Sequence, residues 1–201
     1  MAFNLVFIDD NMNEGLEHPF VRAIGKFNED AKVSVFVDPV QGLNYVMENL
    51  NSRMIVFVDC KFDGYGLQGI NILKKIRETT SLLYIVMMSA NPLSQIAGVD
   101  VAEMINQDFI WFFDRNNGTV KDACTLIGEI KNLWDVRLDC VLENWLIKHA
   151  EKKDEVILVK GNTSYTWNDV LQAVRRHTDV GKYFEKVMNQ YFIARFKTHE
   201  V

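Results

Sequence analysis

The chain is poor in proline, in cysteine and in long apolar runs. Its 3 cysteines among 201 residues are odd in number and show no paired pattern, which argues against a disulfide framework and fits a reducing compartment. Its longest apolar runs, such as LLYIVMM, fall far short of the roughly 20 residues that a membrane helix needs. The first residues show neither a basic segment nor a cleavage site. The sequence therefore predicts a cytoplasmic protein with no membrane segment.

The chain also lacks an excess of positive charge. Residues 1–134 carry 11 Lys or Arg against 17 Asp or Glu, and residues 135–201 carry 11 against 10. Neither part has the basic excess that usually accompanies nucleic-acid binding. The 4 histidines are scattered, without the spacing of a zinc site. With 48% hydrophobic and 24% charged residues, the composition is that of an ordinary globular protein.

The first two thirds of the chain alternates apolar runs with amphipathic segments. Five short apolar runs lie at 4–8, 32–37, 54–58, 82–88 and 109–113. Helix-like segments lie between and after them, at 18–29, 39–51, 69–79, 92–106 and from about Gly118 onward, with Pro39 and Pro92 as first-turn prolines. Continuous apolar runs indicate strands buried on both faces. We therefore predict an α/β fold, a doubly wound five-stranded parallel sheet.

Polar residues stand directly after four of these runs, where parallel sheets bind their ligands. They are Asp9 and Asp10, Asp59, Ser89, and Asp114 with Arg115. Three neighbouring carboxylates need a counter-cation to stay ionised, and hard oxygen ligands suit Mg²⁺. This arrangement favours a phosphoryl group placed on Asp59, with Ser89 and Arg115 contacting its oxygens. Each residue alone is more typical of a turn or a helix cap than of a functional site, so the prediction depends on their joint occurrence.

Residues 1–130 resemble the receiver domain of two-component response regulators. The resemblance is carried by Asp9-Asp10, by MIVFVDCKFDGYGLQGINILKKIRE around Asp59 and by YIVMMSA around Ser89. It implies the flavodoxin-like receiver fold and Mg²⁺ as cofactor, held by Asp9, Asp10, Asp59 and the backbone carbonyl of Lys61. It also implies that Asp59 is the phosphoacceptor, with a sensor histidine kinase or a phosphotransfer protein as donor.

The chain departs from the family pattern at two places, after the fifth run and after Asp59. Arg115-Asn116 stands where the family has Lys-Pro, which keeps the charge but not the compact ammonium. A one-residue shift of this alignment would turn Asp114 toward the site instead. The loop after Asp59 lacks the usual proline and is about two residues longer. Phe112 lies near the family's aromatic switch position, and a core strand residue is the equal alternative.

Residues 131–201 are predicted to form an extended helix, a short β-hairpin and two further helices. The segment from Thr119 to Glu155 has no Pro and no Gly beyond Gly128, so one helix running on past the first domain is expected. Its apolar stripe would pack on the core or on a partner helix, or form a homodimer seam. The hairpin turns at KGNT, and the later helices begin with Asn168 and Asp179 as caps.

The last two helices carry two further features. Aromatic residues of the hairpin segment and of these helices are predicted to form a small core, with a protein-binding surface as the alternative: Tyr165, Trp167, Tyr183, Phe184, Tyr191, Phe192 and Phe196. The two helices also loosely match a helix-turn-helix, in which Arg175 and Arg176 would meet phosphates.

The leading hypothesis is a response regulator that relays phosphorylation of Asp59 through residues 131–201 to a downstream protein partner. One alternative is a pseudo-receiver that binds proteins without phosphorylation, and another is a DNA-binding transcription regulator. A phosphohydrolase is disfavoured because Asn11 follows Asp9-Asp10, so the D-x-D arrangement of such enzymes is missing. No enzyme activity beyond self-phosphorylation and autodephosphorylation is expected.

Overall fold

The computed structural model describes residues 3–50 and 53–197. The chain divides into two compact units, residues 1–132 and residues 133–201. No helix within the described ranges has the length and apolar character needed to cross a membrane.

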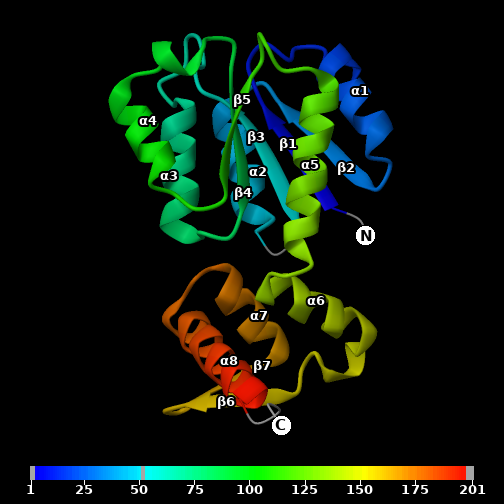
Figure 1. Cartoon of the computed structure of the whole chain (residues 1–201), viewed down its shortest axis with the longest axis vertical. Helices are drawn as coiled ribbons and strands as arrows, with labels where there is room; N and C mark the ends of the chain where they lie inside the picture. The colour runs from blue at the N-terminus through cyan, green and yellow to red at the C-terminus, as the bar shows by residue number, and fades with distance from the viewer. Residues whose placement is uncertain (1–2, 51–52, 198–201) are drawn as a thin grey trace. The chain divides into compact units, whose positions relative to one another are not determined.

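The N-terminal unit is built on a five-stranded parallel sheet (Figure 1). Its strands follow the order β2-β1-β3-β4-β5 and comprise β1 (Phe3–Ile8), β2 (Ala31–Phe36), β3 (Met54–Asp59), β4 (Tyr84–Ser89) and β5 (Ile110–Asp114). Every residue of β3 and β4 is buried, as expected for central strands covered on both faces. The predicted fold class and all five strand positions are confirmed.

Helices cover both faces of this sheet (Figure 1). They are α1 (Pro19–Phe27), α2 (Pro39–Glu48), α3 (Gly69–Thr79), α4 (Gly98–Ile105) and α5 (Val120–Trp134). Leu43 of α2, Ile72 of α3 and Met104 of α4 share one core cluster with the sheet. On the other face, the ring of Phe20 from α1 packs against those of Phe7 and Phe113.

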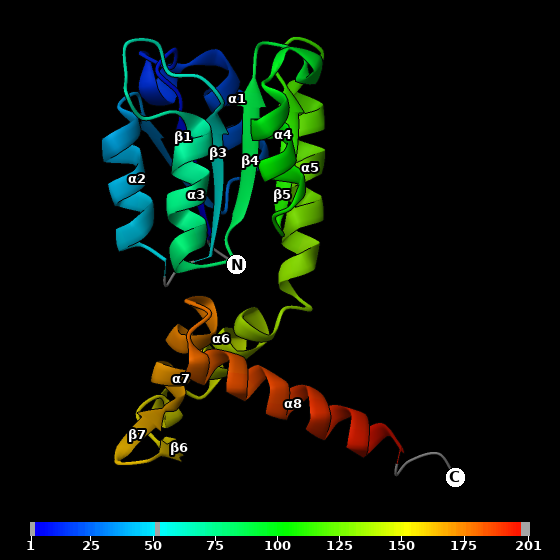
Figure 2. The same cartoon turned by 90° about the vertical axis from the view of Figure 1, so that its left-hand side faces the viewer.

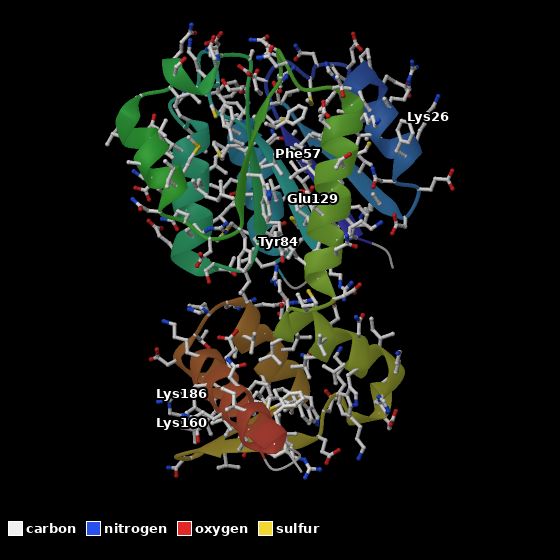
Figure 3. The ribbon with its side chains drawn as sticks, in the orientation of Figure 1. Lys26, Phe57, Tyr84, Glu129, Lys160 and Lys186 are labelled. Carbon is white, nitrogen blue, oxygen red and sulfur yellow. The ribbon has the colours of Figure 1, made fainter. Side chains whose placement is uncertain are left out.

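The interior of the sheet is aromatic as well as aliphatic. Phe57 and Tyr84 are fully buried, while Lys26 on α1 and Glu129 on α5 are exposed (Figure 3). Phe57 stacks on Phe7 across neighbouring strands, with ring centroids 5.0 Å apart. Such pairs add to the free energy gained from burial alone.

The predicted start of α2 is correct and that of α4 is not. Helix α2 has Pro39 in its first turn as predicted, and Asp38 caps it by accepting hydrogen bonds from the amides of Val40 and Gln41. The helix predicted at 92–106 is wrong in its first half. Leu93–Gln95 forms a 3₁₀ turn and α4 begins only at Gly98. Glycine in a helix interior costs about 1 kcal/mol, which favours a helix that begins there.

The described part of the C-terminal unit, up to residue 197, contains three α-helices and a hairpin. It comprises α6 (Leu138–Lys148), a 3₁₀ turn (Ala150–Lys152), β6 (Val156–Lys160), β7 (Thr163–Thr166), α7 (Trp167–Arg175) and α8 (Asp179–Lys197). The hairpin and the two last helices are confirmed. The hairpin turns at Gly161, whose φ of +62° is a conformation that glycine adopts without strain.

The single extended helix predicted after Thr119 is wrong. Helix α5 ends at Trp134, and Arg137 has an extended backbone, with ψ of 136°, before α6 begins. The guanidinium of Arg137 donates to both carboxylate oxygens of Asp139, at 3.0 and 2.9 Å. Asp139 lies in the first turn of α6, where negative charge is stabilised. A side-chain pair therefore replaces the Pro or Gly expected at a helix break.

The predicted caps of the last two helices are also wrong. Thr166, not Asn168, caps α7, and its hydroxyl and amide exchange hydrogen bonds with Asp169. Thr178 precedes α8, and its hydroxyl accepts from the amide of Gly181 at 3.3 Å. Asp179 lies in the first turn of α8. Threonine followed three residues later by an acid is a capping box, and the sequence TWND shows it.

Arg175 is buried in the C-terminal unit, which contradicts its suggested contact with DNA phosphates. It is 4% exposed, and its guanidinium pairs with Glu143 at 2.7 Å and with Asp139 at 3.5 Å. Asp139 is itself 3% exposed. A buried charge of this kind is retained by its partners and is unavailable to a ligand. Arg176 is exposed.

The aromatic residues of α8 do not form the predicted core. Tyr183, Tyr191, Phe192 and Phe196 are between 45% and 77% exposed. Trp167 is the aromatic centre of this unit, because its ring packs against those of Trp145 and Phe184. The core prediction therefore holds for Trp167 and Phe184 and fails for Tyr183 and for the aromatic residues of the second half of α8.

We expect Gly69→Ala to destabilise the N-terminal unit by about 2 kcal/mol or more. A Cβ at Gly69 would lie 2.1 Å from the carbonyl oxygen of Asp59, so β3 and α3 would have to separate. Gly128→Ala on α5 is the matched control. Its Cβ meets nothing within 4 Å, so the change should stabilise by about 0.5–1 kcal/mol. Urea unfolding of both variants tests this, and equal stabilities would contradict the close approach at Gly69.

Candidate functional site

Three carboxylates meet at the carboxyl edge of the sheet. Asp9 follows β1, Asp10 comes next, and Asp59 ends β3, which is paired directly with β1. One ligand oxygen from each of the three lies within 4.8 Å of the others. Asp9 is fully buried and Asp59 is 7% exposed, while Asp10 is half-buried. The sequence prediction that these acids converge is thus matched by their positions.

Backbone amides hold the first two acids in place. Asp9 accepts a hydrogen bond from the amide of Asn11 at 2.8 Å. Asp10 accepts from the side chain of Asn11 at 3.0 Å and from the amide of Asp63 at 2.7 Å. The contact with Asp63 joins the loop after β1 to the loop after β3. Both acids are therefore fixed in orientation by neutral donors.

The environment of Asp59 disfavours its charged form. Burial raises the pKa of Asp59 to about 7, and the neighbouring charges of Asp9 and Asp10 act in the same direction. The backbone amide of Lys61 and the charge of Arg115 oppose this rise in pKa. A cation placed among the three acids would reverse the balance, because it favours every ionised carboxylate near it. The donor set, three hard oxygens with one half-exposed member, fits Mg²⁺.

Arg115 supplies positive charge to this cluster. Its guanidinium forms an ion pair with the carboxylate of Asp9, and its side chain is 22% exposed. Its backbone amide donates to the carbonyl of Ser89 at 2.8 Å, which anchors the loop after β5 beside β4. The chain thus brings Arg115 to the acids as the sequence predicts.

Asp114 turns away from the acid cluster. Its carboxylate accepts from the amide of Asn116 at 2.9 Å and from the side chain of Asn117 at 2.8 Å. These bonds within its own loop hold the pKa of Asp114 below its ordinary value. The shifted alignment, in which Asp114 rather than Arg115 faces the site, is therefore not what the structure shows.

Ser89 and Phe112 lie where the sequence places them, at different depths. Ser89 ends β4, is 4% exposed and accepts from the amide of Asn91 at 2.9 Å. It borders a cavity of about 270 Å³ whose wall includes Cys60, Asn91 and Met104. Phe112 lies inside β5, half-buried against the core cluster. This position agrees with a core residue, and a switch role for Phe112 stays a prediction.

Lys61 contributes its backbone rather than its ammonium group. Its amide faces the carboxylate of Asp59, whereas its Nζ lies 3.3 Å from Asp63 on an exposed surface. The burial of Cys60 raises its thiol pKa to about 12, which disfavours the thiolate form. The Lys61 carbonyl as a metal ligand stays a prediction.

Sequence reasoning missed Gln68, which organises the loop after β3. Its side-chain amide donates to the carbonyls of Phe62 and Tyr65, at 3.0 and 2.8 Å, and accepts from the amide of Phe62 at 2.9 Å. It also caps α3 in a reciprocal box with Asn71. The signal was available in QGIN, a polar residue followed three positions later by another before an apolar helix. Asn116 was missed too, and its side chain donates to the carbonyl of Ala90.

We expect Asp59→Asn to stabilise the metal-free protein. Because its folded-state pKa is raised to about 7, ionised Asp59 costs stability as pH rises from about 4 to 7. The variant should therefore match wild type near pH 4 and exceed it by about 1–3 kcal/mol at pH 8. Urea unfolding in a chelator measures this. Asp63→Asn, which changes an exposed carboxylate, is the control, and a pH-independent difference for Asp59→Asn would refute the expectation.

No protein-family model matches the chain, and no curated protein matches it.

Solved structures do match the N-terminal unit. A response regulator receiver domain protein from Clostridium thermocellum is similar over 68% of this chain and 98% of its own, with 22% identity and a TM-score of 0.52. The receiver domain of RcsB from Salmonella enterica serovar Typhimurium, solved with the phosphomimetic BeF3⁻, matches 66% of this chain and 90% of its own. Its identity is 19% and its TM-score 0.48. The N-terminal unit therefore has the receiver fold of response regulators.

Proposed function

We propose that this chain is a response regulator that accepts a phosphoryl group on Asp59. The observation that carries the proposal is the acid cluster at the carboxyl edge of a receiver-fold sheet, with Arg115 beside it. Asp9, Asp10, Asp59 and the carbonyl of Lys61 would hold Mg²⁺. When bound, the ion would neutralise charge that develops on the transferring phosphoryl group.

In the proposed reaction, a carboxylate oxygen of Asp59 attacks phosphorus on a phosphohistidine of the donor protein. The new bond joins oxygen to phosphorus, the bond from phosphorus to the imidazole nitrogen breaks, and the imidazole takes up a proton from water. Asp59 must be ionised to attack, and its raised pKa makes this depend on nearby positive charge. Asp59 ends the buried strand β3, so its backbone is held in place at the carboxyl edge of the sheet.

Ser89 and Arg115 would receive the new phosphoryl oxygens. Ser89 ends β4 and Arg115 follows the neighbouring strand β5, and a backbone hydrogen bond of 2.8 Å joins them. Arg115 would have to exchange Asp9 for the phosphoryl group, because its guanidinium is paired with Asp9. This exchange would change the local charge and could displace the loop after β5, which carries Arg115.

The C-terminal unit would carry the response to a downstream protein partner, in the cytoplasm. A sensor histidine kinase or phosphotransfer protein would be the phosphoryl donor, and no further enzyme activity is proposed. A DNA-binding output is disfavoured because Arg175 is buried in ion pairs with Asp139 and Glu143.

A pseudo-receiver is the second candidate, and one observation favours it. Arg115 already neutralises the carboxylate of Asp9 by an ion pair, and a bound metal ion would need that same carboxylate as a ligand. If this pair is too stable to open, the fold would serve as a binding module without phosphorylation.

A titration with beryllofluoride and Mg²⁺ separates these candidates. Beryllofluoride mimics the phosphoryl group and needs no kinase, and NMR of the full chain would follow amides near Ser89 and Arg115. The proposed function predicts shifts that require Mg²⁺ and vanish in Asp59→Asn. Absence of any response at millimolar ligand, from folded protein, would overturn the proposal and support the pseudo-receiver.

We expect Arg115→Gln to strengthen Mg²⁺ binding by roughly 10-fold, since removing a competing cation from Asp9 is worth at least about 1.4 kcal/mol at this range. Lys61→Gln removes the same charge from a nearby exposed position that pairs with Asp63. It should leave the affinity within about 2-fold, because exposed charges are screened. Calorimetric titration without beryllofluoride compares the two, and equal effects would show that Arg115 does not compete directly.

A further inference from the structure

The cavity beside Ser89 is a pocket that the proposed phosphoryl transfer does not use. Helices α3 and α4 lie side by side on one face of the sheet (Figure 2). The cavity lies between these helices and the loops after β3 and β4, and its volume is about 270 Å³. Neither the three clustered carboxylates nor Arg115 line it, so it is distinct from the acid cluster.

The inner wall of this cavity is apolar. Met87 and Met104 are buried, and Ile70 and Ile96 are half-buried against the same core cluster. Methionine side chains adapt their shape to what they contact, so such a wall accepts ligands of different outline. A dry cavity of about 150 Å³ holds a benzene ring. The volume of about 270 Å³ is therefore enough for one ring with a short side chain.

The wall formed by α4 carries a carboxylate without a counter-ion. Asp100 lines the cavity from the first turn of α4, where the helix dipole stabilises negative charge, and it is half-buried. Within the part of the chain that the structure describes, its carboxylate has no ion-pair partner and no hydrogen-bond donor. Burial and then the charges of Asp59 and Asp100 raise the pKa of the Cys60 thiol, which also lines the cavity. The charge of Asp100 therefore acts on the cavity interior.

The lysines beside the cavity are each paired with another acid. Nζ of Lys61 lies 3.3 Å from the carboxylate of Asp63, and Nζ of Lys74 on α3 lies 3.6 Å from that of Glu103 on α4. An anionic ligand would be repelled by Asp100 and by the nearby acid cluster. A cationic ligand would supply the counter-charge that Asp100 lacks.

We propose that this cavity binds a small primary amine with an aromatic body. The ring would pack on Met87, Met104 and Ile96, and the ammonium group would pair with Asp100. Asn91 and Gln95 also line the cavity, and their side-chain oxygens can accept the other ammonium protons. An apolar wall with a few polar groups is the usual composition of a small-molecule site. This proposal is independent of phosphorylation at Asp59.

Three probes of similar size and different charge test the proposal: phenethylamine, phenethyl alcohol and phenylacetate. NMR titration of the full chain would follow the amides of Cys60, Ser89 and Asp100. Phenethylamine should bind with a dissociation constant of roughly 1 mM or tighter. It should bind roughly 5-fold more tightly than the isosteric alcohol, because one half-buried ion pair distinguishes them. Phenylacetate should bind more weakly than either.

Asp100→Asn should abolish the preference for the amine. The variant should bind phenethyl alcohol as wild type does, which also shows that its cavity is intact. Glu78→Gln is the matched control, because it makes the same charge change on an exposed side chain in the last turn of α3, outside the cavity lining. It should keep the roughly 5-fold preference.

Three results would overturn the proposal. The first is the absence of saturable shifts at the cavity with every probe at millimolar concentration. The second is binding of phenylacetate as tight as that of phenethylamine, which would mean that charge does not select the ligand. The third is an equal loss of preference in Glu78→Gln and Asp100→Asn, which would assign the preference to the net charge of the protein rather than to Asp100.

Discussion

Repulsion among three carboxylates at one sheet edge is the constraint to which the surrounding loops respond. Asp9 and Asp59 lie almost entirely out of water, where like charges are screened least. This repulsion is offset by hydrogen bonds from the backbone amides of Asn11, Lys61 and Asp63 and by the positive charge of Arg115. The same charge repulsion therefore couples the loops after β1, β3 and β5. A change in the charge of Asp59 is expected to affect all three loops.

Much of the N-terminal unit was predictable because burial leaves a strong trace in the sequence. Strands covered on both faces must be apolar throughout, so β3 and β4 appear as unbroken runs. Parallel strands all end at one edge, so the polar residues after them meet, as Asp9 and Asp59 do. Their hydrogen bonds were not predictable, because the partners of Asp10 and Gln68 depend on loop shapes that no periodic pattern encodes.

The C-terminal unit shows where pattern reading fails. The helix break before α6 depends on Arg137 bonding Asp139, two charged residues that a pattern assigns to a solvated face. Arg175 was taken to be exposed for the same reason, although it lies in a cluster of four charged side chains, two cationic and two acidic, that are joined by ion pairs. For α8 the error is the opposite one, because aromatic residues that were predicted to be buried are exposed. Apolar residues on a helix indicate that it can pack against an apolar surface, but not that its own chain supplies that surface.

The three hydrogen bonds between the Gln68 side chain and the loop after β3 restrict which residue can occupy position 68. The loop from Phe62 to Tyr65 presents it with two carbonyls and one amide, so the residue must donate twice and accept once. A lysine lacks the acceptor, and a glutamate lacks the donors and would add a fourth negative charge near the acids. Asparagine has the chemistry but a shorter reach. The loop that carries Lys61 and Asp63 is thus shaped by an uncharged group, which adds no charge of its own beside Asp9, Asp10 and Asp59.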